Sequence, residues 1–417
     1  MNPFELKPQN PEKLLMNWRD LSPQPYNKQT VDPYTRARVI LMNGTEFEAV
    51  GFSHQFSRHC QDNALRRELA LCRRMEQQQQ KLLGALKDPD ESILEHTLGY
   101  EQLAVDLTAA LAQREDNPYV KQALDFALLE DFDHLYRYSD LMELDTRHDP
   151  ERLVGRYTEI MPGRPTIAHH RHPFDSIKHS IDNASASPVT RLCANIITAA
   201  EQQTMNYYMN IAPFYPTSHG RALYREIGMV EEQHVSQYGS LIDPRQTWLE
   251  GLLNRQYTEC YLYWSAMETE CDPRIKGIWT RLFDQEITHL HMAARLLQQY
   301  EGKDPAQVIP DGAFPDPLRL TGNIEYVRDV LSGSVWLTAL RESWTNLCDL
   351  SPDADFFRYQ AIVNDDIQDV ASHAVVERLI RREGEDYRFE VAPNPIPALR
   401  DRRRDNTSVG RVPGAEC

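Results

Sequence analysis

The sequence predicts an all-α protein built from tandem helical bundles, and three observations support this fold class. Long stretches of the chain are poor in Gly and Pro and repeat their apolar residues at helical spacing. Short turns rich in Pro, Asn and Asp divide these stretches into pairs. Carboxylate and histidine residues recur at matching places on the paired stretches. The chain is therefore predicted to form four helical hairpins.

Composition excludes several classes of protein. The chain has 417 residues and a net charge of -17, which argues against a nucleic-acid partner because such binding needs a basic surface. No apolar run approaches the ~18 residues that a membrane helix needs. The N-terminus lacks the basic start and apolar core of a signal peptide, so a cytoplasmic location is expected. No Cys-x-x-Cys pair is present, which argues against a rubredoxin-type iron site or a zinc ribbon.

The first part of the chain is expected to precede the bundles. Residues 1–35 are rich in Pro, Asn and Gln and are predicted to be extended. Residues 36–50 are predicted to form a β-hairpin, because Asn43-Gly44 favours a tight type I′ turn between two apolar runs. We therefore assign residues 1–57 to an N-terminal extension.

The first bundle is predicted between residues 58 and 243. Helical patterns cover residues 60–86, 118–144, 189–210 and 218–241, and a further helix is capped by residues 88–92 and carries Glu101. The four glutamines 77–80 fit an exposed helix end. Residues 145–188 contain several prolines and are predicted to form a long crossover. Its cluster His169-His170-Arg171-His172 is expected to be an exposed loop feature, with metal binding as the alternative.

Two hairpins of this bundle repeat one arrangement of carboxylates and histidines. In the second, Glu231 and His234 lie three residues apart on one helix face, and Glu201 precedes Glu231 by thirty residues across a turn. One hundred residues earlier, the first hairpin has the same spacings. Its residues are Glu101, Asp131 and His134. A buried carboxylate needs a partner or a metal ion, so these six positions predict a buried metal site.

The second half of the chain suggests a second bundle, over residues 244–385. Helices are predicted at 248–270 and 275–300, and a fourth hairpin at 323–350 and 355–382. They carry a second set of candidate metal ligands, Glu259, Glu286, His289, Glu342, Asp369 and His373. A degenerate copy that only supports the first bundle, held by a buried polar network, is the alternative. Residues 386–417 are predicted to be a charged, Pro-rich tail.

The first set of residues resembles a known family. Four carboxylates and two imidazoles can hold two divalent first-row metal ions. One Glu from each of two helices and a Glu-x-x-His pair from each of the other two is the pattern of ferritin-like di-iron bundles. Over residues 88–242, the sequence therefore resembles the ferritin-like di-iron carboxylate superfamily. It departs from the pattern at Asp131, where Glu is expected, and the adjacent Glu130 is an alternative ligand.

This resemblance implies a function. The expected cofactors are two iron ions, or one iron and one manganese, and the expected activity is that of an oxygenase or oxidase that uses dioxygen to oxidise a small organic substrate. A separate reductase would supply electrons, because no Gly-rich dinucleotide motif is evident. The alternatives are an iron-binding or peroxide-protection protein without an organic substrate, and a metal-free scaffold. Substrate and oligomeric state do not follow from the sequence.

Overall fold

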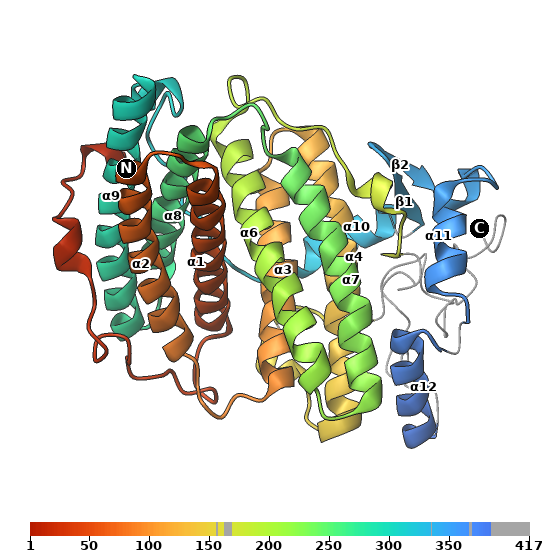
Figure 1. Ribbon diagram of the computed structural model, residues 1–417. Coiled ribbons are helices and arrows are strands. Elements are labelled where there is room, and N and C mark those ends of the chain that lie inside the picture. Colours follow the sequence, from red (N-terminus) through yellow and green to blue (C-terminus); the bar gives the residue numbers. More distant parts are fainter. Residues whose placement is uncertain (156, 162–168, 335, 367–368, 385–417) are drawn as a thin grey trace. The chain divides into compact units, whose positions relative to one another are not determined.

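The computed structural model describes residues 1–417 except 156, 162–168, 335, 367–368 and 385–417 (Figure 1). It confirms that the protein is mainly α-helical. The helices are α1 (Pro33–His59), α2 (Asn63–Ala85), α3 (Ile93–Arg114), α4 (Pro118–Thr146), α5 (Glu151–Val154), α6 (Pro188–Ile211), α7 (Ser218–Leu241), α8 (Trp248–Thr269), α9 (Pro273–Glu301), α10 (Ile324–Ser334), α11 (Asp355–Val363) and α12 (Ala371–Glu383). The strands are β1 (Leu337–Leu340) and β2 (Ser343–Asn346). The tail predicted at 386–417 lies outside the described residues.

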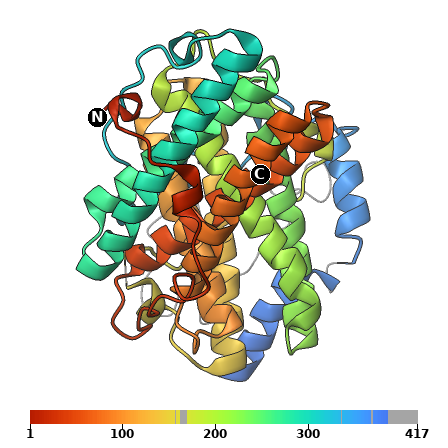
Figure 2. The same cartoon turned by 60° about the vertical axis from the view of Figure 1, so that its left-hand side comes forward.

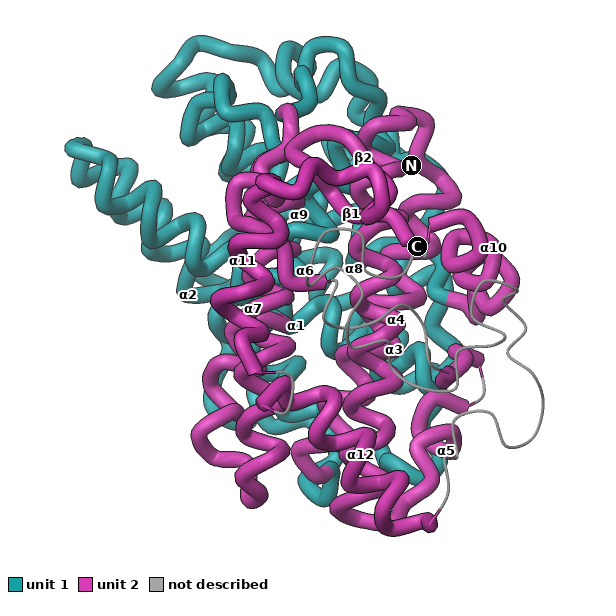
Figure 3. Tube along the Cα trace, turned by 90° about the vertical axis from the view of Figure 1, so that its right-hand side faces the viewer, with its two compact units in different colours: residues 1–91, 180–203, 242–320 teal, residues 92–179, 204–241, 321–417 magenta. Residues whose placement is uncertain are grey.

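The chain forms two compact units, and each is assembled from three separate segments (Figure 3). Unit 1 consists of Met1–Glu91, Ser180–Gln203 and Ile242–Leu320. Unit 2 consists of Ser92–His179, Thr204–Leu241 and Thr321–Cys417. These units do not follow the contiguous domains predicted at 1–57, 58–243 and 244–385. The reason is that helix pairs distant in sequence bury their apolar faces against each other.

Unit 1 contains the helix pairs α1–α2 and α8–α9. Within each pair the two helices pack along one another, and contacts of α1 with α8 and of α2 with α9 join the pairs (Figure 2). The predicted partner of α8 and α9, residues 323–382, belongs instead to unit 2. The prediction of a second bundle over 244–385 was therefore wrong, because the first two helices of the chain take that place.

Helix α1 replaces the β-hairpin predicted at 36–50. The Asp32 side chain accepts hydrogen bonds from the backbone N–H groups of Tyr34 and Thr35, and Pro33 occupies the first turn, which is a strong helix start. Gly44 lies inside this helix rather than in a turn. A Cβ there would come within 2.0 Å of the Gln203 Oε1 atom, so glycine is needed for close packing and not for a positive φ.

The N-terminal segment before α1 lies over α2 and α9 of unit 1. The backbone N–H of Met16 donates to Gln78 Oε1 at 2.8 Å, and His291 Nε2 lies 2.8 Å from the carbonyl oxygen of Leu6. Leu14 is buried between these points. The segment therefore covers the outer face of the α2–α9 contact.

Unit 2 contains α3, α4, α7 and the C-terminal end of α6. Helix α3 packs along α4, α4 contacts α7, and α12 lies against both α4 and α7. Apolar side chains from these helices form one core, which includes Leu98, Leu135, Tyr208, Ile227 and Val375. This core surrounds the polar cluster described below.

The hairpin predicted at 323–350 is not helical throughout. Helix α10 ends at Ser334, and β1 and β2 form an antiparallel pair in which Leu337 faces Asn346 and Leu340 faces Ser343. Arg341 between them has a φ of 54°, the left-handed conformation of a tight turn. The helix predicted at 355–382 is divided into α11 and α12. In the β1–β2 segment, the aromatic and β-branched residues favour strands more than the spacing of apolar residues favours a helix.

Within the described residues, no helix is long and apolar enough to cross a membrane.

Candidate metal centre

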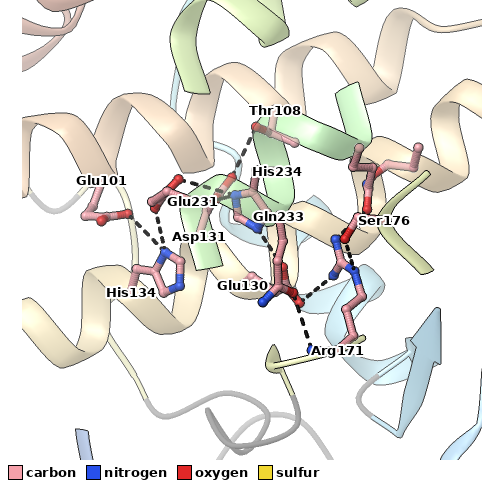
Figure 4. A network of polar contacts seen from close by, with 12 residues as sticks. Glu101, Thr108, Glu130, Asp131, His134, Arg171, Ser176, Glu231, Gln233 and His234 are labelled. Atoms are coloured by element: carbon pink, nitrogen blue, oxygen red, sulfur yellow. Dashed lines mark hydrogen bonds and ion pairs between the residues drawn. The ribbon is translucent and has the colours of Figure 1, made fainter. Parts of the chain in front are cut away.

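Five of the six residues predicted as first-site ligands come together inside unit 2 (Figure 4). They form two overlapping groups, in each of which every residue offers a ligand atom within 4.8 Å of the others. One group comprises Glu101, His134 and Glu231, and the other includes Asp131, Glu231 and His234. All five side chains are 0% exposed. Glu231 belongs to both groups, so the two groups share one carboxylate.

Helix geometry accounts for this convergence. The Asn117 side chain accepts from the N–H groups of Tyr119 and Val120, and Pro118 begins α4, which fixes where this helix starts. Asp131 and His134 then lie one turn apart on the face that meets α3 and α7. Glu231 and His234 show the same spacing on α7. Two i, i+3 pairs on neighbouring helices thus face each other.

His134 turns one ring nitrogen toward two carboxylates. Its Nδ1 atom lies 2.9 Å from Glu231 Oε1 and 4.0 Å from Glu101 Oε2. Its Nε2 atom is buried and makes no hydrogen bond. The atom that faces the carboxylates is therefore the one positioned for a metal ion.

His234 is oriented by a carboxylate outside the two groups. Its Nε2 atom lies 2.6 Å from Glu130 Oε2. Its Nδ1 atom lies 3.3 Å from Asp131 Oδ1 and 3.4 Å from Glu231 Oε2. If the ring proton resides on Nε2 and is donated to Glu130, the Nδ1 lone pair faces the ligands, as in carboxylate–histidine–metal arrangements.

Glu130 is itself held by a buried arginine. Arg171 Nη1 donates to Glu130 Oε1 at 3.0 Å, and Arg171 Nη2 donates to Gln237 Oε1 at 2.7 Å. Of the two alternative ligands on α4, Asp131 thus faces the metal-ligand groups, whereas Glu130 faces Arg171 and the far side of His234. The geometry favours Asp131.

The expectation that residues 169–172 form an exposed loop was wrong. His169 and Arg171 are 0% exposed, and His170 is 5% exposed. Sequence reasoning missed the role of Arg171, because it lies in a crossover without helical periodicity. The sequence feature that could have indicated this role is the position of Arg171 between histidines in the predicted crossover.

Neutral donors support the remaining carboxylates. The Tyr208 hydroxyl on α6 donates a short hydrogen bond to Glu101 Oε1. The Thr108 hydroxyl lies 3.3 Å from Asp131 Oδ2 and donates to it. Both donors hold one oxygen of a carboxylate and leave the other oxygen for a second partner.

The electrostatics of the cluster depend on its histidines. Burial raises the pKa of Glu231, but hydrogen bonds to His134 and His234 more than offset burial and leave this pKa well below its ordinary value. Burial and the neighbouring Glu101 carboxylate raise the pKa of Tyr208 well above its ordinary value. Glu231 is therefore held as an anion, and Tyr208 as a neutral donor.

The sixth predicted ligand, Glu201, is buried on α6, in the part of this helix that belongs to unit 1. It precedes Tyr208 by seven residues. On an α-helix that spacing puts both side chains on one face, two turns apart. Glu201 thus shares the α6 face whose Tyr208 contacts Glu101.

The second set of candidate ligands is divided between the two units. Glu259, Glu286 and His289 are buried in unit 1, on α8 and α9. The other three belong to unit 2. Glu342 is exposed between β1 and β2 and pairs with His179 at 2.5 Å, Asp369 is exposed, and His373 is buried on α12. The structure therefore does not form one centre from these six residues.

No family model matches the sequence, and neither a curated protein nor a solved structure matches the chain.

Proposed function

We propose that unit 2 holds a dinuclear iron centre, or an iron–manganese centre, and that the protein is an oxidoreductase of the oxygenase or oxidase type. The observation that carries this proposal is the shared position of Glu231 in two buried ligand groups, each with one histidine nitrogen facing its carboxylates. Such a centre, when loaded with ferrous ions, supplies electrons and open coordination positions for dioxygen chemistry.

The donor set fits two divalent first-row ions. Glu101, Glu231 and His134 offer two carboxylates and a nitrogen to one ion. Asp131, Glu231 and His234 offer the same to the other. Glu201, on the α6 face that carries Tyr208, is proposed as the sixth ligand and adds a carboxylate to the second ion. Carboxylates neutralise the ions, and one imidazole for each ion favours iron or manganese over magnesium or calcium.

The surrounding residues keep the ligands in place and in the required protonation state. Arg171 donates to Glu130, and Glu130 is placed to accept a hydrogen bond from His234 Nε2, which would leave the Nδ1 lone pair for a metal ion. Tyr208 and Thr108 hold one oxygen each of Glu101 and Asp131. These contacts preorganise the ligands before any ion arrives.

Burial of the cluster supports a second candidate function. Every ligand in unit 2 is 0% exposed, which suits small reactants such as dioxygen or peroxide better than a bulky organic molecule. The alternative is therefore peroxide protection or iron handling, in which no organic substrate is bound. Anaerobic reaction of the ferrous protein with hydrogen peroxide, compared with its dioxygen uptake in the presence and absence of candidate substrates, distinguishes the two functions.

The first experiment measures metal content by plasma mass spectrometry on untagged protein after anaerobic loading with ferrous ions. We expect Glu231→Ala to lose two ions per chain relative to the wild type, because its carboxylate serves both groups, and to lose dioxygen-dependent turnover. Glu232→Ala is the matched control, since Glu232 is the exposed neighbour on the same helix. Equal metal content and equal turnover in Glu231→Ala and the wild type would refute the proposal.

A further inference from the structure

Unit 1 contains a second cluster of buried carboxylates, and its spacing in sequence matches that of the first. Glu46 on α1 precedes Glu76 on α2 by thirty residues, as Glu101 precedes Asp131. Gln79 follows Glu76 by three residues, where His134 follows Asp131. The sequence prediction missed this repeat because residues 36–50 were assigned to a β-hairpin and the glutamines 77–80 to an exposed helix end.

The α8–α9 pair supplies the rest of the cluster. Glu259 lies on α8, and Glu286 and His289 lie three residues apart on α9. Glu46, Glu76, Gln79, Glu259, Glu286 and His289 are each at most 1% exposed. The helices that carry them all belong to unit 1 and contact each other in pairs, α1 with α2 and α8, and α9 with α2 and α8.

Hydrogen bonds join these side chains in three groups. Gln79 Nε2 donates to Glu286 Oε1 at 2.6 Å. Gln256 Nε2 donates to Glu76 Oε1 at 3.1 Å and to Glu259 Oε2 at 2.5 Å. The Tyr263 hydroxyl donates to Glu46 Oε1 at 2.6 Å, much as Tyr208 donates to Glu101 in unit 2. Each of the four buried carboxylates is therefore held by a neutral donor from unit 1, and Gln256 bridges two of them.

These hydrogen-bonded groups leave several buried polar atoms without a partner. His289 Nδ1 lies 3.1 Å from Glu286 Oε1, but His289 Nε2 makes no hydrogen bond. Glu46 Oε2 and Glu76 Oε2 are also buried and unpartnered. His289 and Glu76, together with Cys72, bring potential ligand atoms within 4.8 Å of one another. Orphaned acceptors on different helices that face a common interior mark the place of an absent cation.

A bound cation would allow these carboxylates to ionise. In the described part of the chain, no lysine or arginine forms an ion pair with Glu46, Glu76, Glu259 or Glu286. Several carboxylates in a dry interior cannot all ionise without positive charge nearby. A small cavity of about 20 Å³ is lined by Glu259, Glu48 and Arg255, and it has room for a single water-sized particle beside Glu259.

We propose that unit 1 holds a second divalent-cation site, independent of the one in unit 2, centred on Cys72, Glu76 and His289, with further ligands drawn from Glu46, Glu259 and Glu286. Because carboxylates outnumber the single imidazole and the single thiol in this donor set, the site prefers an oxygen-seeking first-row ion such as Mn²⁺. Gln79 stands where a second imidazole would be, which separates this site chemically from that of unit 2.

The test uses the full-length Glu231→Ala protein, in which the unit 2 site is disabled, and Mn²⁺ as the probe. Equilibrium dialysis followed by electron paramagnetic resonance should show at least one tightly held Mn²⁺ per chain. Adding Glu259→Gln should weaken Mn²⁺ binding at least ~10-fold. Loss of a residue that only hydrogen-bonds to a metal ligand already costs about this much, and loss of a ligand itself should cost no less. Glu268→Gln, an exposed position on the same helix, should not change it.

The spectrum of bound Mn²⁺ provides a second reading, which reports the ligand atoms rather than the affinity. Pulsed measurements on the Glu231→Ala protein should show coupling to one imidazole nitrogen, and His289→Ala should remove that coupling. In the same background, Gln79→His should raise the affinity for Zn²⁺, because it restores a second imidazole.

Each outcome has one meaning. A folded Glu231→Ala protein that binds no Mn²⁺ overturns the second site and leaves the proposal for unit 2 untouched. Equal ferrous binding by wild type and Glu231→Ala, with binding lost in Glu259→Gln, overturns the unit 2 centre and leaves the second site standing. Binding that Glu259→Gln, Glu76→Gln and His289→Ala all leave unchanged shows that the ion lies elsewhere.

Discussion

Unit 2 and unit 1 place similar residues at corresponding helix positions, but they surround the histidines differently. The corresponding pairs are Asp131 and Glu76, His134 and Gln79, Glu231 and Glu286, and His234 and His289. In unit 2, Glu130 precedes Asp131 and accepts from His234 Nε2. In unit 1 the residue before Glu76 is Met75, which is buried and apolar. His289 Nε2 accordingly has no carboxylate behind it.

The difference shows that the ligands alone do not define such a site. In unit 2, Arg171 donates to Glu130, and Glu130 lies 2.6 Å from His234 Nε2 and so orients this imidazole. The buried cluster of unit 1 has one histidine, His289, a glutamine in place of the other, and no carboxylate bonded to His289 Nε2. We therefore expect unit 2 to bind iron tightly, and unit 1 to bind a harder ion more weakly. Three predictions test that contrast, in order of decreasing effect.

The largest effect is expected from the outer carboxylate of unit 2. Glu130→Gln removes the charge that orients His234, so the affinity of unit 2 for ferrous iron should fall about 10–100-fold. Mn²⁺ binding by unit 1 should stay the same, because no corresponding carboxylate exists there. Competition with a chelator measures both, and Glu232→Gln serves as the control. An unchanged iron affinity would show that His234 does not depend on Glu130.

The second prediction concerns the loss of folding stability in unit 2 as the pH is lowered. Burial raises the pKa of Glu226 in unit 2, but the hydrogen bonds and charge of His170 and the bond from Ser372 on α12 lower it from 4.5 to about 2. A lowered folded-state pKa gives stability that is present above pH 4.5 and lost as pH falls toward about 2. The loss should be on the order of 2 kcal/mol.

Unit 1 should respond to acid in the opposite sense. Burial raises the pKa of Glu259 well above its ordinary value, so in chelator-treated protein falling pH favours the folded form through this group. Hydrogen exchange, corrected for the intrinsic effect of pH, should show α12 loosening before α8. Glu226→Gln should remove the acid step in α12. Simultaneous loosening of both helices would contradict the contrast.

The smallest effect tests the close helix packing of unit 1. Gly44→Ala places a Cβ 2.0 Å from Gln203 Oε1 and 3.1 Å from its Cβ, and should destabilise the protein by about 1–3 kcal/mol. Gly51→Ala on the same helix meets no atom within 4 Å and should stabilise it by up to about 1 kcal/mol. Denaturant unfolding measures both changes. A stabilising Gly44→Ala would show that Gln203 moves away freely.

Most helices of unit 2 could be predicted from sequence because their signals are local. The helix predicted at 118–144 is observed as Pro118–Thr146, since Asn117 and Pro118 mark its start. The convergence of Glu101, Asp131, His134, Glu231 and His234 follows from one spacing repeated in two hairpins. The sequence could not decide between Asp131 and Glu130 as the candidate ligand. These two residues are adjacent on one helix, and only the tertiary structure shows which neighbours each side chain faces.

The parts that failed depend on distant contacts. Asn43-Gly44 has the sequence of a tight turn, but packing against Gln203 uses the glycine inside α1. The 323–350 segment has helical spacing, but it contains the pair β1–β2. Arg171 lies in a segment without periodicity, and its partner Glu130 is forty-one residues away.

Local signals in the sequence predicted where most helices begin and end and which carboxylates and histidines gather in unit 2, because caps, prolines and i, i+3 spacing act within a few residues. The tertiary structure decided which helix pairs share a unit, and so placed α1 and α2 beside α8 and α9. Burial of apolar faces drives that choice, and it depends on the fit of whole surfaces rather than on the order of helices along the chain.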